Sequence, residues 1–261
     1  MIPLIQLKGF ESDGITLTSC ADPAFDGMAK SWFAGNLADL LELKPLLVCL
    51  SNQSGRTLVA YTLLWDISRD GQTEHTFAQA KYPDAVAAAV PERSNEIRAG
   101  ERIIAAMGIE LDSGQWNGRP TGEFYLRQFA ERSREYDNAT SLDISLDAVV
   151  FEDGELIGPD RSKLQDHFAA YVSAKQDLYR SLVNGLDSGR SMAEVFRPVE
   201  EEVRTDPRSR LHSGDLLAAY RRLAMEDAGR WRRKHGDGAL SNALRAAIRK
   251  EPFAIRRRAE S

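Results

Sequence analysis

The chain has 261 residues, of which 43% are hydrophobic and 28% are charged, so it can build a sizeable core beneath a well-solvated surface. This composition excludes a disordered chain, except at the C-terminal end, and two cysteines are too few for a disulfide framework or a structural zinc site. The net charge of −5 excludes an overall positive field that would attract nucleic acid.

The charge is divided unevenly along the chain. Residues 220–261 contain twelve Lys and Arg against five Asp and Glu, a local charge of +7, which leaves −12 for the residues before them. The N-terminus lacks the basic and apolar regions of a signal peptide, and the most apolar stretch, 40–50, is interrupted by Glu42, Lys44 and Pro45. We therefore expect a reduced, cytoplasmic protein without a transmembrane segment; the alternative is a secreted chain whose signal has been removed.

The first quarter of the chain carries strand signals on either side of a helical one. Residues 14–19 alternate apolar and polar side chains, as a half-buried strand does. Apolar residues at three- and four-residue spacing predict helix in part of 22–43. The runs 46–50 and 57–65, separated by the turn-forming residues 52–55, predict two adjoining strands.

Further along the chain, strands alternate with two short helical patterns. Asp70-Gly71 is a pair that tolerates the positive φ of a tight hairpin, and 73–78 is expected to return as a strand. The alanine-rich segment 82–90 predicts a short helix, and 102–111 predicts a strand. Residues 123–136 have helical periodicity and would be an insertion between strands.

The pattern changes from strand to helix near residue 158. Residues 142–151 form a strong strand signal, followed by the hairpin pair Asp153-Gly154 and a short return strand at 155–157. Apolar residues from Leu164 to Leu186 then share one face of a long helix, with Asp160 as its expected N-cap.

Three further helices are expected after this one. They span 191–203, 213–235 and 239–249, and Pro198 is expected to kink or break the first of them. The sequence thus predicts a region of strands followed by a region of helices.

Three segments resemble parts of an immunoglobulin-like sandwich. PLLVCLSNQSGRTLVAYTLLW at 45–65 resembles two adjoining strands, IRAGER at 97–102 resembles a loop that precedes a strand, and LDAVVFEDGELIGPD at 146–160 resembles a closing hairpin. Together they are similar to uncharacterised bacterial proteins that carry a degenerate immunoglobulin-like domain, over roughly residues 14–158. The resemblance implies a fold and no activity, because sandwiches have many unrelated functions.

The predicted fold is therefore α+β. An immunoglobulin-like β-sandwich with inserted short helices would occupy residues 1–158, and an α-helical C-terminal segment would occupy 159–261. Trp65, at the end of its strand, is expected to be buried in the sandwich core.

The residue types that carry catalysis do not form a recognisable site. Cys49 lies in an apolar strand, where burial keeps a thiol inert; whether it pairs with Cys20 cannot be deduced from the sequence. The four histidines have no metal-ligand spacing, and the nucleophile elbow, the P-loop and the dinucleotide fingerprint are absent. We predict no catalytic residue, no bound metal and no cofactor.

Acidic residues on the strand 142–151 are the one group that suggests chemistry. Asp143 and Asp147 are four positions apart, so in a regular strand they share a face, where two carboxylates could hold a cation or transfer protons. The alternation with apolar residues instead favours the solvated face of an edge hairpin.

The basic C-terminal region is the candidate interaction surface. Such a cluster can bind phosphate or anionic lipid, an acidic protein, or the acidic part of its own chain, and it can also be a solvated helix face. We predict electrostatic docking, in cis or in trans, through Arg230, Arg232, Arg233, Lys234, Arg256, Arg257 and Arg258.

The function favoured by these observations is that of a non-catalytic binding or adaptor protein that contacts a protein partner or a second copy of itself. One alternative is a hydrolase-type enzyme of unrecognised class, with acidic residues near 152–160. The other is a nucleic-acid-associated protein that uses the basic C-terminal helices, although few aromatic residues there could stack on bases.

Overall fold

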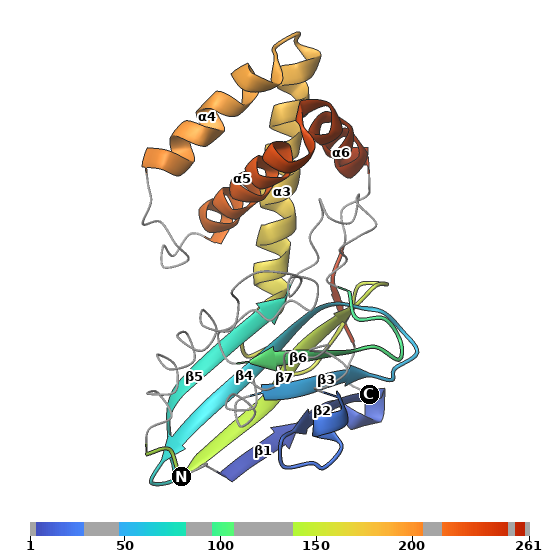
Figure 1. Cartoon of the computed structure of the whole chain (residues 1–261), viewed down its shortest axis with the longest axis vertical. Coiled ribbons are helices and arrows are strands. Elements are labelled where there is room, and N and C mark those ends of the chain that lie inside the picture. Colours follow the sequence, from blue (N-terminus) through green and yellow to red (C-terminus); the bar gives the residue numbers. More distant parts are fainter. Residues whose placement is uncertain are drawn as a thin grey trace. The chain divides into compact units, whose positions relative to one another are not determined.

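The computed structural model describes residues 4–28, 47–81, 96–106, 138–205, 216–249 and 254–258 (Figure 1). The chain divides into two compact units. The sheet unit comprises Met1–Lys81, Glu96–Ser162 and Arg257–Ser261, and the helical unit comprises Tyr82–Asn95 and Lys163–Arg256. The helices expected at 82–90 and 123–136, and most of the one expected in 22–43, lie outside the described residues.

The sheet unit contains two sheets. The six-stranded sheet has the order β5-β4-β7-β8-β9, with β1 also paired to β7, and the three-stranded sheet has the order β2-β3-β6. The strands of the larger sheet are β1 (Leu4–Lys8), β4 (Leu58–Arg69), β5 (Gln72–Lys81), β7 (Ser141–Phe151), β8 (Glu155–Ile157) and β9 (Arg256–Arg257). Those of the smaller sheet are β2 (Ile15–Ser19), β3 (Leu47–Asn52) and β6 (Arg102–Ala106).

The strand β7 lies in the middle of the larger sheet. One of its edges pairs with β4, and the other pairs in parallel with β1 near its start and antiparallel with β8 near its end. Register shifts between β4 and β7 mark bulges, which bend strands and increase their twist, and the sheet is curled into a half-barrel. The expected hairpin of residues 142–157 is confirmed as β7 with β8, but the expectation that it lies at an edge of the sheet is wrong.

The two sheets share one apolar core. It combines side chains of the small sheet, such as Val48 and Leu50, with side chains of β4 and β7, such as Leu63 and Ile144. Trp65 has no exposed surface and lies in this core, which confirms the expected burial. Alternate residues of β4 and β7 enter the core because successive side chains of a strand point to opposite faces.

The helical unit is built around a second core. The helices in its described residues are α3 (Leu164–Asp187), α4 (Met192–Thr205), α5 (Leu216–His235) and α6 (Asp237–Arg249). Leu182 of α3, Phe196 of α4, Met225 of α5 and Leu244 of α6 meet in that core. The expected helices are thus confirmed, and α4 continues through Pro198 without a break.

The entry to α3 differs from the expectation. The helix begins at Leu164 after Lys163, which has a positive φ of 56° and makes no side-chain cap, so Asp160 is not the N-cap. The carboxylate of Asp147, in β7, instead accepts the backbone N–H groups of Arg161 and Ser162 at 3.0 and 2.8 Å. Asp147 is buried for this structural reason and does not lie on a solvated face.

Both units together confirm an α+β protein with strands in two sheets and helices toward the C-terminus. The immunoglobulin-like β-sandwich stays a prediction. Across the described parts of the chain, each helix is too short or too polar to cross a lipid bilayer.

Candidate functional site

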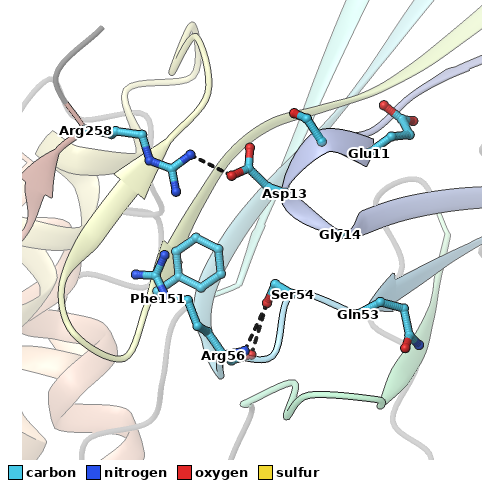
Figure 2. Close-up of a pocket in the computed structure, with 9 residues that line it drawn as sticks. Glu11, Asp13, Gly14, Gln53, Ser54, Arg56, Phe151 and Arg258 are labelled. Atoms are coloured by element: carbon cyan, nitrogen blue, oxygen red, sulfur yellow. Dashed lines mark hydrogen bonds and ion pairs between the residues drawn. The ribbon is translucent and has the colours of Figure 1, made fainter. Parts of the chain in front are cut away.

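A charged cavity of about 520 Å³ lies in the sheet unit (Figure 2). Its walls come from four places in the sequence: the 3₁₀ helix η1 (Glu11–Asp13) with Gly14, the turn 53–56 between β3 and β4, the end of β7, and Arg258 just after β9. Pairing within and between the sheets brings these distant segments together.

The turn between β3 and β4 is organised by a buried asparagine. The side-chain amide of Asn52 donates to the carbonyls of Arg56 and Ile97 at 2.7 and 2.8 Å, and its oxygen accepts the hydroxyl of Ser54 at 2.6 Å. These bonds fix the path of the turn and thereby the position at which the Arg56 side chain leaves it.

Glycine is required where η1 meets this turn. Gly14 has a φ of +74°, and its carbonyl accepts the backbone N–H of Gln53 at 2.7 Å. A Cβ at this position would lie 2.9 Å from the backbone of Gln53, closer than real contacts allow. Any larger residue would push η1, with Asp13, away from the turn.

Arg56 is held from three directions. Its guanidinium lies 3.7 Å from the centroid of the Phe151 ring, in the geometry of a cation–π contact. Nη1 donates to Glu155 at 2.5 Å, and Nη2 donates to both oxygens of Asp153 at 2.6 Å. Figure 2 shows the guanidinium beside the aromatic ring.

Arg258 reaches the same network from the other end of the chain. Its Nη1 donates to Asp13 at 2.6 Å, while Nε and Nη2 donate to the two oxygens of Glu155 at 2.8 and 3.0 Å. Its backbone N–H donates to the carbonyl of Leu156 at 3.0 Å. Glu155 thus receives two guanidinium groups, and Asp13 extends the network to η1.

The carboxyl groups of Glu155 and Asp153 have pKa values below their usual range. The guanidinium of Arg258, with that of Arg56, lowers the pKa of Glu155 from 4.5 to about 2. The backbone N–H of Glu155 and the Arg56 guanidinium also lower the pKa of Asp153, and Glu155 followed by Asp13 raises the pKa of Arg258. A general acid or base works best with a pKa near the operating pH, so these groups are suited to holding charged partners.

The predicted docking residues of α5 belong to the helical unit. Arg230 pairs with Asp227, and Arg232 pairs with Asp237 at 2.7 Å while lying over the Phe196 ring at 5.2 Å. Arg233 and Lys234 are exposed on the last turns of the helix.

The other three docking residues lie at β9. Arg256 is exposed, and Nη2 of Arg257 donates to the carbonyls of Gly158 and Pro159 at 3.2 and 2.8 Å. Arg258 is the one member of the predicted set that lines the cavity. The structure therefore divides the seven residues between the two units.

The remaining chemical candidates do not come together at this cavity. Cys20 and Cys49 form no disulfide, and burial raises the pKa of Cys49. No group of three or more potential ligands for a metal ion occurs among the described residues, so Asp143 is not part of such a set there. His167 instead shares a hydrogen bond of 2.8 Å with the Tyr220 hydroxyl in the helical unit.

Sequence reasoning missed Asp13, Arg56 and Phe151. The turn-forming residues 52–55 and the Asp153-Gly154 hairpin were visible as local signals, but nothing in the sequence relates them to each other or to η1. Comparisons of the chain with models of protein families, with curated proteins and with solved structures found no match.

Proposed function

We propose that this chain is a non-catalytic binding or adaptor protein that acts through protein–protein contacts, with the charged cavity of the sheet unit as its recognition site. One observation carries the proposal: charged side chains from distant segments are fixed around an open space by ion pairs with one another. Groups that are already fixed and ionised suit recognition, because their side chains lose little conformational entropy when a partner binds.

The state of the acidic residues favours binding over hydrolysis. The 152–160 segment that a hydrolase would use has four acidic residues, and two of them, Asp153 and Glu155, pair with the arginines of the network and have a lowered pKa. Neither is therefore prepared to give or take a proton near neutral pH. The pairing of Arg230 and Arg232 with carboxylates of their own unit likewise weakens the alternative of phosphate-backbone binding.

Three finer predictions form part of the proposal. The common core of the two sheets supports the immunoglobulin-like interpretation. Loops of such sandwiches commonly bind partners, which agrees with a binding function. The lack of a disulfide at Cys20 and Cys49 supports a reducing, cytoplasmic location. The exposed side chains of Arg233 and Lys234 support a second, electrostatic contact with an acidic partner.

The test is a quantitative pull-down with the full-length chain. The cavity variant Glu11→Gln/Asp13→Asn removes two lining carboxylates, and the matched control Asp166→Asn/Asp177→Asn removes two carboxylates from α3. We expect proteins that are retained by the wild type and the control to be lost by the cavity variant. Retention of the same proteins by all three chains would contradict the proposal, and so would the absence of any retained protein.

A further inference from the structure

We propose that Asp13 and Glu155 form a guanidinium-binding site for an arginine-bearing extended segment of a protein partner, and that the chain's own residues 256–258 occupy this site in competition with it. The inference rests on the proposed function and names the class of partner. Its motivation is that Arg258 already shows how an arginine is recognised there.

The site forms hydrogen bonds with both the side chain and the main chain of Arg258, which now occupies it. Three guanidinium nitrogens of Arg258 are bonded to carboxylate oxygens of Asp13 and Glu155, a fork geometry that an ammonium group cannot reproduce. The backbone N–H of Arg258 is bonded to Leu156 of β8, so the segment is added to the sheet as an extra strand. Strand addition with a side-chain pocket is a recurring mode of peptide recognition.

The present occupant is short and only partly buried. The strand β9 contains two residues, and it covers the outer edge of β8, which itself contains three. Arg258 keeps 42% of its side-chain surface exposed. A strand of this length depends on the ion pairs of Arg258, and an exposed ion pair gives little net stability because water competes for both charges. A longer segment of a partner can therefore displace it.

Charge and space both favour an arginine-bearing segment. Residues 1–158 contain 13 Lys and Arg against 24 Asp and Glu, a net charge of −11 that attracts a basic chain. The cavity beside Arg258 also offers Glu11 and the polar side chains of Ser12, Gln53 and Ser54 to residues that flank the arginine. An acidic peptide or a phosphate group would meet the carboxylates of Asp13 and Glu155 and be repelled.

Occupation in cis makes binding competitive. A tethered segment has an effective concentration on the order of millimolar, so a free segment of similar affinity binds the intact chain only weakly. Removal of the Arg258 side chain opens the site without touching its carboxylates. The chain is therefore expected to bind a free arginine-bearing peptide more tightly once its own Arg258 side chain has been removed.

The experiment uses a fluorescent peptide with the sequence of residues 254–258, AIRRR, and measures its anisotropy with full-length protein. We expect the R258A chain to bind the peptide at least about tenfold more tightly than the wild type, because its site is no longer occupied in cis. An R258K chain should fall between the two, since lysine keeps the charge and loses the fork. The control R180A changes an exposed arginine of α3 that has no place in the proposed contacts, and it should behave as the wild type does.

Two further comparisons test the site itself. Adding D13N and E155Q to the R258A chain should abolish the gain, whereas adding D166N and D177N should preserve it. A peptide with the R258Q change should bind the R258A chain at least about tenfold more weakly than AIRRR, as expected when a charge-assisted fork is lost. Circular dichroism and thermal unfolding establish that each variant is folded.

Equal affinity of the wild-type and R258A chains for AIRRR would overturn the inference, and so would a gain that survives the loss of both carboxylates. If peptide binding fails while the pull-down still depends on Glu11 and Asp13, the class of partner is wrong and the proposed function stands. If both fail, the cavity is not a recognition site.

Discussion

Two of the ionic clusters among the described residues differ in their contact with water. In the sheet unit, the cavity network includes Glu155 and Arg258, whose side chains are 28% and 42% exposed. In the helical unit, Lys175 is 1% exposed, and its ammonium group donates to the Tyr171 hydroxyl and lies 3.7 Å from Asp227. Exposed charges exchange partners at little cost, whereas a buried charge that loses its partner is strongly destabilising.

The buried cluster extends along the contact between α3 and α5. His167, Tyr171 and Lys175 follow one another at four-residue intervals on α3, so they share a face of that helix. The Tyr171 ring meets the Tyr220 ring of α5 edge to face at 5.7 Å, and Tyr220 shares a hydrogen bond with His167. Such a cluster fixes how two helices pack, while the cavity network leaves its groups open to a ligand.

A substitution in the apolar core of the sheet unit gives the loss of stability against which the two ionic clusters can be compared. Trp65→Ala should lower the free energy of unfolding by about 3–5 kcal/mol, because it removes a fully buried aromatic side chain and leaves a cavity. Urea unfolding followed by circular dichroism measures the change. A loss below about 0.5 kcal/mol, which is typical of surface positions, would place Trp65 outside the core.

The buried cluster should respond almost as strongly to the loss of one charge. Asp227→Ala should cost about 3 kcal/mol, because it removes a carboxylate from a buried ammonium group. Adding Lys175→Met should recover part of that loss, since the buried ammonium group that Asp227 compensates is then absent. The exposed Asp177 of α3 is the matched control, and its change to Ala should cost under about 0.5 kcal/mol in the same urea titration. Equal effects at the two aspartates would remove the distinction between the clusters.

The cavity network should contribute less, and in a pH-dependent way. Glu155→Gln should cost about 1 kcal/mol at pH 7, because the carboxylate is partly exposed and solvent screens its ion pairs. The pKa of Glu155 is lowered from 4.5 to about 2 in the folded chain, so its contribution is present above pH 4.5 and disappears as the pH falls toward 2. Urea midpoints of the wild type and the variant should therefore converge between pH 5 and pH 2. A constant difference over this range would show that the charge of Glu155 does not matter.

The smallest effect is expected at the exposed end of α5. Arg233→Ala should change stability by less than about 0.5 kcal/mol, because the side chain is exposed to solvent. Thermal unfolding at low salt is the sensitive measurement. A larger loss would mean that this arginine stabilises the helical unit and is not available to a partner.

The parts of the fold that were predictable are those that depend on local pattern. The strand expected at 57–65 overlaps β4, which begins one residue later and continues to Arg69. The strand expected at 142–151 coincides with β7 apart from one residue, and the long apolar stripe that starts at Leu164 is α3. Each of these has a periodicity that follows from which face is buried. The strand β9 consists of two arginines and has no such pattern. It pairs with β8 because the folded sheet leaves that edge open.

The candidate site was predictable only in fragments. Arg258 was expected to dock electrostatically, but neither of its carboxylate partners carries a signal that identifies it. Asp13 lies in a single 3₁₀ turn, and Glu155 follows the hairpin turn at Gly154. The N-cap expected for α3 at Asp160 was wrong for a related reason. The backbone N–H groups of Arg161 and Ser162 donate instead to Asp147, which lies 14 and 15 positions before them in the chain. Contacts of this kind form between residues that only the packed structure brings together, so they cannot be predicted from sequence spacing.

The ion pair between Asp13 and Arg258 joins residues that are 245 positions apart. The entropy lost on closing a loop grows with its length, and an exposed ion pair returns too little free energy to close so long a loop by itself. We therefore expect this contact to form after the hairpins of β4 with β5 and β7 with β8, and to open before them in local unfolding. During synthesis, the wall of the cavity that Arg258 supplies is missing until residues 256–258 have been made.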